Sequence, residues 1–310
     1  MTYALPTISY VQWGKEASYP DETSNSEPAT TCDEDFWEVQ SINDSQKNNL
    51  IKLYQLTGGR DVNSVVNGRF DANLKVECNL TTDDAPWELI IGSLAAGTAT
   101  PTNTLPSFAV EIGYKDYSGS LKRAKFHGCK INSAALSYNK KGEPVKVSLD
   151  ILTQRVWITD VLQTPTAPTD VPLTDFECSL ELPNASALTD VQSFSTTIAH
   201  NLVEQSDNRA RFKADLITGK RDYTHDFSLY FNGTTRLENF LGNAGYAVDG
   251  VTPDSEATME LTITKGGNTV VILWGVTYFE DFSAPLDIGG DLVVQKFTGF
   301  SKTMTSVVVS

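Results

Sequence analysis

Apolar and polar residues alternate along several stretches of the chain. From Phe70 to Leu80 every second residue is apolar, and the residues between them are Asp, Asn, Lys or Glu. A period of two is typical of a β-strand that buries one face against a core and turns the other to water or a partner. The pattern recurs in residues 108–114, 145–151, 227–231 and 259–263. We therefore predict a mainly β fold.

Two segments predict short helices. Asp83 or Asp84 can cap a helix that starts at Pro86, with one apolar face made of Trp87, Ile90, Ile91 and Leu94. Thr235 and Glu238 form a capping box before the apolar stripe of Leu237, Phe240 and Leu241. We expect each half of the chain to place one short helix against a sheet.

A proline-rich segment divides the chain. Asp160–Pro172 contains three prolines and no apolar periodicity, which is typical of an extended linker. A length of 310 residues also fits two domains. We predict a first domain over residues 1–160, a linker over 161–172 and a second domain over 173–310.

The two halves are similar to each other. Val39–Ile42 matches Val191–Phe194, and the predicted helices at Trp87 and Arg236 correspond. Two glycine pairs have the same spacing of fourteen residues, Gly128 with Gly142 and Gly275 with Gly289. Matched positions lie about 150 residues apart, so a fused duplication of one β-rich fold is the simplest explanation. The predicted fold is two tandem β-sandwich or barrel domains.

The net charge of −15 argues against tight binding of nucleic acid, which needs clustered Lys and Arg. An acidic wall would instead let a DNA duplex slide past, and the charge could equally serve solubility alone. Glu16–Gln46 carries nine acids and no Lys or Arg, whereas Leu121–Lys146 carries seven basic residues and one acid. These two stretches could attract each other across copies of a self-stacking protein, or form two solvated loops that never meet.

No catalytic or metal-binding motif is present. The sequence lacks G-x-S-x-G, H-E-x-x-H, P-loop and C-x-x-C patterns. The carboxylates of Asp33, Glu34 and Asp35 could bind a cation, but their turn-rich surroundings predict a solvated loop. We interpret His127 and His225 as strand residues and the cysteines as buried small apolar residues, namely Cys32, Cys78, Cys129 and Cys178. We predict no catalytic residue, metal or cofactor.

Nothing in the sequence predicts a membrane anchor or a cleaved signal. The first twenty residues lack a basic start followed by an apolar run, and the longest apolar run, Val270–Trp274, is too short to cross a bilayer. We expect a soluble protein.

Two segments resemble the tail tube proteins, also called major tail proteins, of long-tailed bacteriophages and archaeal tailed viruses. They are Tyr10–Tyr19, and His127–Ser137 together with Gly142–Asp150. The resemblance implies a sheet that joins neighbouring subunits into a closed β-barrel around a channel. It also implies stacked rings built around a tape measure protein, with tail terminator and baseplate proteins at the ends and viral DNA passing through the lumen without specific binding. The location implied is the virion tail, after assembly in the host cytoplasm.

Two domains per chain change the ring that the resemblance implies. Six domains close a ring in single-domain members, so three copies of this chain would give threefold symmetry with a sixfold pseudo-repeat. A second half that serves as decoration would instead leave a ring of six chains. On this picture we expect Asp33, Glu34 and Asp35 to contact Lys122, Arg123 and Lys125 of a neighbouring subunit, at about 0.2–1 kcal/mol for each exposed pair.

A pair of adhesion or decoration β-sandwiches on a virion or cell surface is the alternative function. Five tryptophans could provide stacking platforms for sugars, namely Trp13, Trp37, Trp87, Trp157 and Trp274. Their scatter along the chain, and the place of Trp274 within an apolar strand, favour structural roles. A β-rich hydrolase is disfavoured because the motifs are missing.

Overall fold

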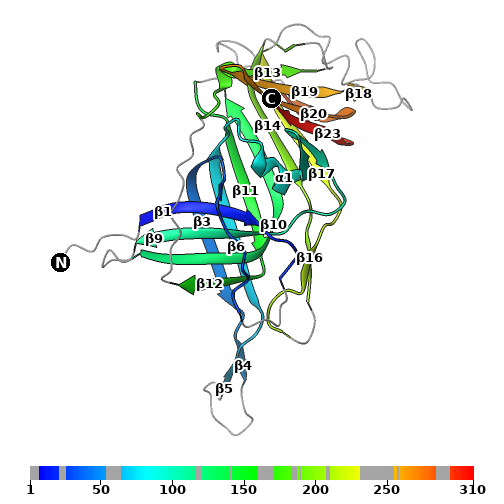
Figure 1. The fold of residues 1–310 in the computed structure, drawn as a ribbon. Coiled ribbons are helices and arrows are strands. Elements are labelled where there is room, and N and C mark those ends of the chain that lie inside the picture. Colours follow the sequence, from blue (N-terminus) through cyan, green and yellow to red (C-terminus); the bar gives the residue numbers. More distant parts are fainter. Residues whose placement is uncertain are drawn as a thin grey trace, which may run out of the picture.

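The structure, a computed structural model, is built almost entirely of antiparallel strands, so the predicted mainly β fold is confirmed (Figure 1). It describes residues 7–20, 26–53, 64–115, 121–139, 142–159, 171–182, 187–188, 190–206, 210–230, 255–256, 258–283 and 294–310. These ranges contain one α-helix, α1 (Ala85–Ile91), and one 3-10 turn, Asp175–Glu177.

The main sheet has the strand order β18–β21–β22–β17–β14–β10–β11–β6–β3. Its strands are β3 (Glu38–Asn48), β6 (Phe70–Asn79), β10 (Leu121–Asn139), β11 (Lys146–Thr153), β14 (Val191–Ala199), β17 (Asp222–Tyr230), β18 (Ser255–Glu256), β21 (Thr277–Ser283) and β22 (Val294–Ser301). Most of the alternating residues predicted to face a core do so, and those of β6 from Phe70 to Cys78 are at most 9% exposed. Tyr114 is half-buried, and Phe231 lies outside the described residues.

Strand β10 is long enough to pair with two groups of strands. Its second half lies in the main sheet, and its first half pairs with β9 (Phe108–Lys115) and β12 (Arg155–Thr159). Strand β1 (Thr7–Lys15) continues this branch beyond β9, and β2 (Glu34–Asp35) pairs with β1. The bend falls at Gly128, whose φ of +62° and lack of space for a Cβ beside Gln154 both require glycine.

A second sheet has the order β13–β19–β20–β23–β8–β7. Its strands are β7 (Gly92–Ala95), β8 (Thr98–Pro101), β13 (Cys178–Glu181), β19 (Met259–Lys265), β20 (Asn268–Trp274) and β23 (Met304–Val309). Two separate hairpins complete the description, β4 (Ile51–Leu53) with β5 (Ser64–Val66) and β15 (Val203–Gln205) with β16 (Asp215–Ile217).

The core lies between the main sheet, the second sheet and α1. Side chains of α1 and β20 meet those of the main sheet around one small cavity lined by Trp87, Ile90, Ala134, Leu136, Val147, Thr196, Ile198, Ile272 and Trp274. The rings of Trp37 and Trp87 pack edge to face at 5.1 Å between centroids. Each large side chain buried here contributes about 1.5–3 kcal/mol, and this tertiary packing stabilises a helix of seven residues that would be marginal alone.

The first predicted helix is confirmed, with one correction. It ends at Ile91, because the next residue, Gly92, leaves the helical region with a φ of +124°, so Leu94 lies in β7 and not on the helix. The second predicted helix, Thr235–Leu241, and most of the predicted linker lie outside the described residues. Among the described residues, no helix has the length and apolar composition needed to cross a membrane.

Candidate functional site

The main sheet contains one four-stranded unit twice. The first unit is β3–β6–β11–β10 and the second is β14–β17–β22–β21. In each unit the strands that come first, second, fourth and third along the chain lie side by side in that order. The units are joined head to tail, because β10, the edge strand of the first unit, pairs with β14, the opposite edge strand of the second unit.

The two units also share their irregularities. Each has a register shift in its first strand and another in the strand at its far edge. The shifts lie between Val39 and Ser41, between Val191 and Ser193, between Ile131 and Ser133, and between Phe279 and Asp281. Alignment on these shifts makes Val39 equivalent to Val191 in the first strands, and Ile131 equivalent to Phe279 in the edge strands. A shared position of bulges supports the duplication.

The same hydrogen bonds connect the first and second strands of both units, at the end where the chain leaves the first strand. Asn49 Nδ2 donates to the carbonyl oxygen of Arg69 at 3.1 Å and to the carboxylate of Asp71. In the second unit, Asn201 Nδ2 donates to Lys220 O at 2.8 Å and to Asp222 Oδ2 at 2.9 Å. A Cβ atom on Gly68 or Gly219 would collide with the carbonyl oxygen of the asparagine in its unit. The sequence analysis did not predict these hydrogen bonds. Their signal in the sequence is an asparagine after one strand, followed by a glycine, a basic residue, any residue and an aspartate at the start of the next strand.

Both sheets join the two halves. In the main sheet β10 pairs with β14 from Ser133 opposite Ala199 to Asn139 opposite Ser193. In the second sheet β23 pairs with β8, with Val307 opposite Ala99. The chain therefore contains one complete unit-to-unit interface.

Each end of the main sheet is a strand with an open edge. Strand β3 spans eleven residues and is exposed from Asn43 to Asn48, and no strand among the described residues pairs with its outer edge. At the other end, β18 pairs with β21 only at Thr277 and Tyr278, and Glu280 and Asp281 are exposed. Open edges of this length invite pairing with another chain.

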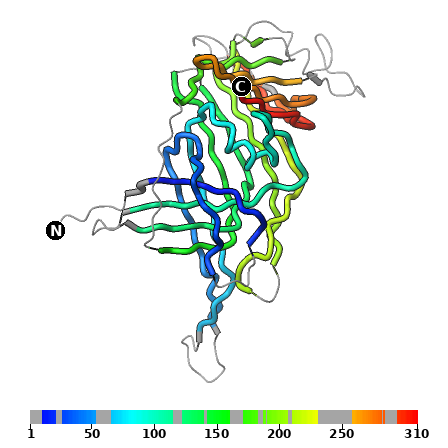
Figure 2. The backbone as a smooth tube through the Cα atoms, viewed as in Figure 1, coloured from blue at the N-terminus to red at the C-terminus, as the bar shows by residue number. Residues whose placement is uncertain are grey.

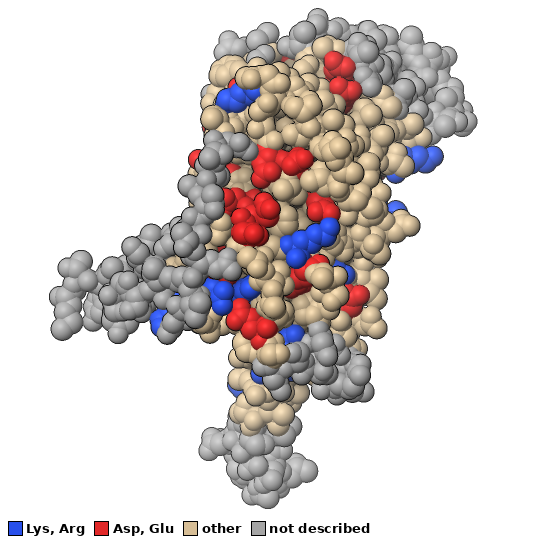
Figure 3. All heavy atoms as spheres, viewed as in Figure 1, with Lys and Arg blue, Asp and Glu red and all other residues tan. Residues whose placement is uncertain are grey.

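The face of the main sheet opposite the second sheet and α1, here the open face, is polar. Its charged residues that reach solvent are Glu38, Lys47, Asp71, Lys75, Glu77, Lys146, Asp150, Asp222, Asp226, Asp281 and Lys296. Seven acids and four lysines give this part of the face a net charge of −3. A face with this charge does not hold the DNA backbone tightly. Figure 3 shows the other side of the molecule, on which α1 and β1 lie in front of the main sheet (Figure 1), and acidic and basic groups are interspersed there without one extended basic patch.

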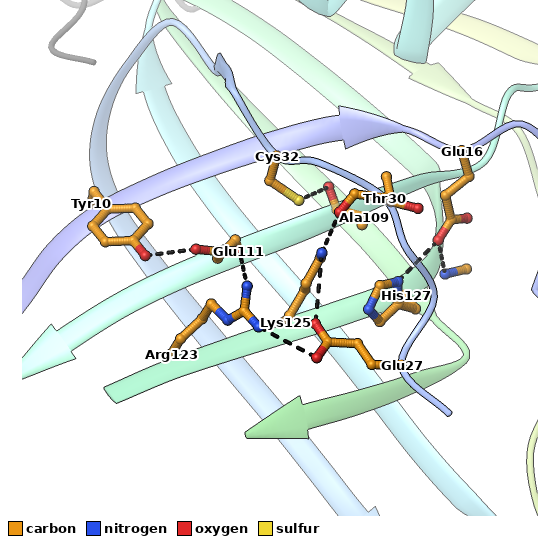
Figure 4. A network of polar contacts seen from close by, with 11 residues as sticks. Tyr10, Glu16, Glu27, Thr30, Cys32, Ala109, Glu111, Arg123, Lys125 and His127 are labelled. Atoms are coloured by element: carbon orange, nitrogen blue, oxygen red, sulfur yellow. Dashed lines mark hydrogen bonds and ion pairs between the residues drawn. The ribbon is translucent and has the colours of Figure 1, made fainter. Parts of the chain in front are cut away.

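The basic residues Arg123 and Lys125 lie in a buried polar cluster (Figure 4). Arg123 Nη1 donates to Glu111 at 3.1 Å and Nη2 donates to Glu27 at 3.1 Å. Lys125 Nζ lies 3.7 Å from Glu27 and donates to the carbonyl oxygen of Thr30. The acidic and basic stretches therefore meet within one chain, through Glu27 in place of the predicted acids.

The remaining predicted contact residues lie around this cluster. Asp33 and Glu34 are exposed, and Asp35 is half-buried beside β1, where burial raises the pKa of its carboxyl despite a hydrogen bond with Gln12. Lys122 is half-buried on β10. Contact of these residues with a neighbouring subunit stays a prediction.

The histidines are strand or core residues. His127 lies on β10 with Nδ1 3.3 Å from Glu16 Oε1, and burial lowers its pKa. His225 lies on β17 between the hydroxyls of Thr196 and Ser301, at 3.0 and 2.8 Å, and burial lowers its pKa to about 3. Burial, and to a smaller extent the positive charge of Arg221, lowers the pKa of His200 to about 4. All three are suited to stay neutral at pH 7.

The cysteines provide no paired chemistry in the described part of the chain. Cys32, Cys78 and Cys129 are buried free thiols, as predicted, and Cys178 is half-buried. Burial raises the pKa of the Cys78 thiol to about 12, which suppresses the reactive thiolate. No group of three His, Cys, Asp or Glu side chains that could hold a metal ion occurs among the described residues.

The tryptophans are poorly placed to bind sugars. Trp13, Trp37, Trp87 and Trp274 are each at most 3% exposed, and Trp157 is half-buried. A stacking platform needs an open ring face. This burial weakens the adhesion alternative.

Comparison with known proteins adds the family. The comparison with curated proteins returned no match. The sequence matches the family described as phage tail tube protein over residues 7–299, which is nearly the whole chain. The protein therefore belongs to the phage tail tube protein family.

Proposed function

We propose that three copies of this chain close into a ring that forms one layer of a viral tail tube. The observation that carries the proposal is the head-to-tail pair of four-stranded units with an open edge at each end. An interface that joins two different edges, one end of the sheet in one copy to the other end in the next copy, is heterologous and generates a ring when the rotation closes. In this account the edge of β21 in one chain joins the edge of β3 in the next, as β10 joins β14 within the chain.

The internal interface specifies the register of the proposed contact. Within the chain, Ser133 lies opposite Ala199. When the two units are aligned on their register shifts, Ser133 corresponds to Asp281 and Ala199 corresponds to Lys47. The proposed contact between chains therefore places Asp281 opposite Lys47. Both charged side chains are exposed, and neither has an ion-pair partner among the described residues. Opposite charges on directly facing strand positions contribute roughly 0.2–1 kcal/mol. The sequence thus supplies complementary charges at the position that the duplication selects.

The open face would form the channel wall. The second sheet and α1 cover the other face, so a ring with a passable lumen places the open face inside. Its polar, weakly acidic surface would let DNA pass without specific binding. Within a virion tail assembled in the host cytoplasm, the wall would first surround a tape measure protein, and the tube would end at tail terminator and baseplate proteins. The role is structural, without catalysis, and two tandem tube-type domains per chain are part of this proposal.

Cysteine cross-linking tests the contact. Directly opposed strand residues have Cα atoms about 4.5–5.5 Å apart, which suits a disulfide. We expect the variant K47C/D281C to give covalent trimers on a non-reducing gel after oxidation of assembled protein. The matched control, N43C/D281C, moves one cysteine by four residues, or about 13 Å along the strand, and should not cross-link. Covalent hexamers would show six chains in the ring, and equal cross-linking of both variants would refute the register.

A further inference from the structure

The two separate hairpins are equivalent parts of the duplicated units. Hairpin β4–β5 lies between β3 and β6 along the chain, and β15–β16 lies between β14 and β17. Ile51 faces Val66 in the first, as Val203 faces Ile217 in the second. Aligned on these facing pairs, Val66 corresponds to Ile217 and the preceding Val65 corresponds to Leu216.

Hairpin β15–β16 is held against the first half of the same chain. Leu216 is fully buried. Lys130 Nζ, on β10, donates to Leu216 O at 2.7 Å and to Asp215 Oδ1 at 2.9 Å. Next to it, Gln154 Nε2 donates to Lys213 O at 2.8 Å. The hairpin of the second unit therefore packs across the internal interface on the first unit.

In the part of the chain that the structure describes, hairpin β4–β5 makes no such contact with the rest of the molecule. Figures 1 and 2 show it extending away from the body of the molecule beyond the ends of β3 and β6. Three of its apolar side chains are open to solvent, with Ile51 53%, Val65 54% and Val66 48% exposed, and the neighbouring Leu50 is 54% exposed. A lone two-stranded hairpin is marginal in water, and clustered exposed apolar residues mark an interaction site.

The second half carries an apolar platform at the place that receives a hairpin in the first. Tyr278 on β21 corresponds to Lys130, because each directly precedes the equivalent residues Phe279 and Ile131. The Tyr278 ring stacks on that of Phe300 at 5.4 Å between centroids, and both rings are half-buried. The facing position changes in step, because the charged Asp215 corresponds to the uncharged Ser64. An ion pair at the internal interface is thus replaced by two uncharged residues at the equivalent place.

We propose that hairpin β4–β5 of one chain packs on the Tyr278–Phe300 pair of the adjacent chain in the same ring, with Val65 buried. The inference rests on the proposed ring and adds a second contact to it. The occupant is another copy of this chain, because the contact continues the interface already formed between the two halves. Val66 points to the opposite side of the hairpin and stays exposed, as its counterpart Ile217 is 46% exposed.

A matched pair of substitutions tests the proposal. Val65→Asp and Val66→Asp alter neighbouring residues of similar exposure, so both variants should keep the thermal unfolding midpoint of the wild-type chain. Val65→Asp would bury a carboxylate without a partner. We expect it to raise the protein concentration at which rings and tubes form at least about tenfold, while Val66→Asp leaves that concentration within about threefold of wild type.

The outcomes separate this contact from the ring itself. Equal effects of the two variants, or none, overturn the hairpin contact while wild-type rings of three chains keep the proposed function. A wild-type protein that forms no ring of three chains under these conditions overturns both. Threefold wild-type rings lost only with Val65→Asp support both, with sedimentation velocity and negative-stain electron microscopy as readouts.

Discussion

Replacing Ile158 by Asp should block ring assembly and leave the isolated chain folded. Ile158 on β12 pairs with Ala124, as Val307 on β23 pairs with Ile272. Ala124 and Ile272 are equivalent, because each lies seven residues before the equivalent residues Ile131 and Phe279. Val307 is fully buried because β23 also pairs with β8, whereas Ile158 is 64% exposed. The duplication therefore places Ile158 where the branch of β1, β9, β10 and β12, which corresponds to the second sheet, would continue into a neighbouring chain.

The size of the effect follows from this exposure. Fully burying an isoleucine contributes about 1.5–3 kcal/mol, so covering a side chain that is 64% exposed contributes about 1–2 kcal/mol per interface. Three interfaces per ring give about 3–6 kcal/mol, and the buried carboxylate of the variant adds a desolvation cost. A free-energy change of about 1.4 kcal/mol is tenfold in an equilibrium constant, so the assembly concentration should rise by more than tenfold.

Sedimentation velocity over a concentration series measures this shift, and circular dichroism checks the fold. The control is Val171→Asp, because Val171 is similarly exposed at 60% but has no counterpart at the internal interface. We expect the control to assemble like wild type. Normal assembly of Ile158→Asp would refute the equivalence of the internal and external interfaces.

Two further predictions concern the isolated chain. Arg123→Ala leaves the carboxylate of Glu111 without its buried cation, so the free energy of unfolding in urea should fall by about 3–5 kcal/mol. The control Lys146→Ala removes only an exposed ion pair with Glu143 and should cost less than about 1 kcal/mol, and equal losses would contradict the paired cluster. His225 is neutral in the folded chain down to a pKa of about 3 but takes up a proton below pH 6.5 when unfolded, so it makes stability fall as the pH drops through this window. His225→Asn should reduce the slope of unfolding free energy between pH 6 and 4 by up to about 1.4 kcal/mol per pH unit, and an unchanged slope would contradict the burial.

The sequence predicted what depends on local periodicity. Alternation identified β6, β9, β11, β17 and β19, because one buried face imposes a period of two on the residues. The nearly constant separation of matched positions indicated the duplication, which the shared register shifts of the two units support. The end of α1 at Gly92 was readable from the glycine itself, yet Leu94 fits the helical spacing equally well, and only the pairing of β7 with β8 decides.

The sequence did not predict which residues far apart along the chain contact each other. Charge complementarity indicated that the acidic and basic stretches attract, but it does not specify whether they meet within a chain or between chains. In the structure, Arg123 donates a hydrogen bond to Glu27 of the same chain, and the predicted acids Asp33 and Glu34 remain exposed. The pairing of β10 with β14 likewise depends on tertiary packing, because every polar-faced strand offers similar edge groups.

Cryo-electron microscopy of assembled tubes tests the central claim most directly. The account predicts rings of three chains with six similar lobes, in which β21 of each chain pairs with β3 of the next and Asp281 lies opposite Lys47. A ring of six chains, or a ring in which β3 and β21 both remain unpaired, would contradict it.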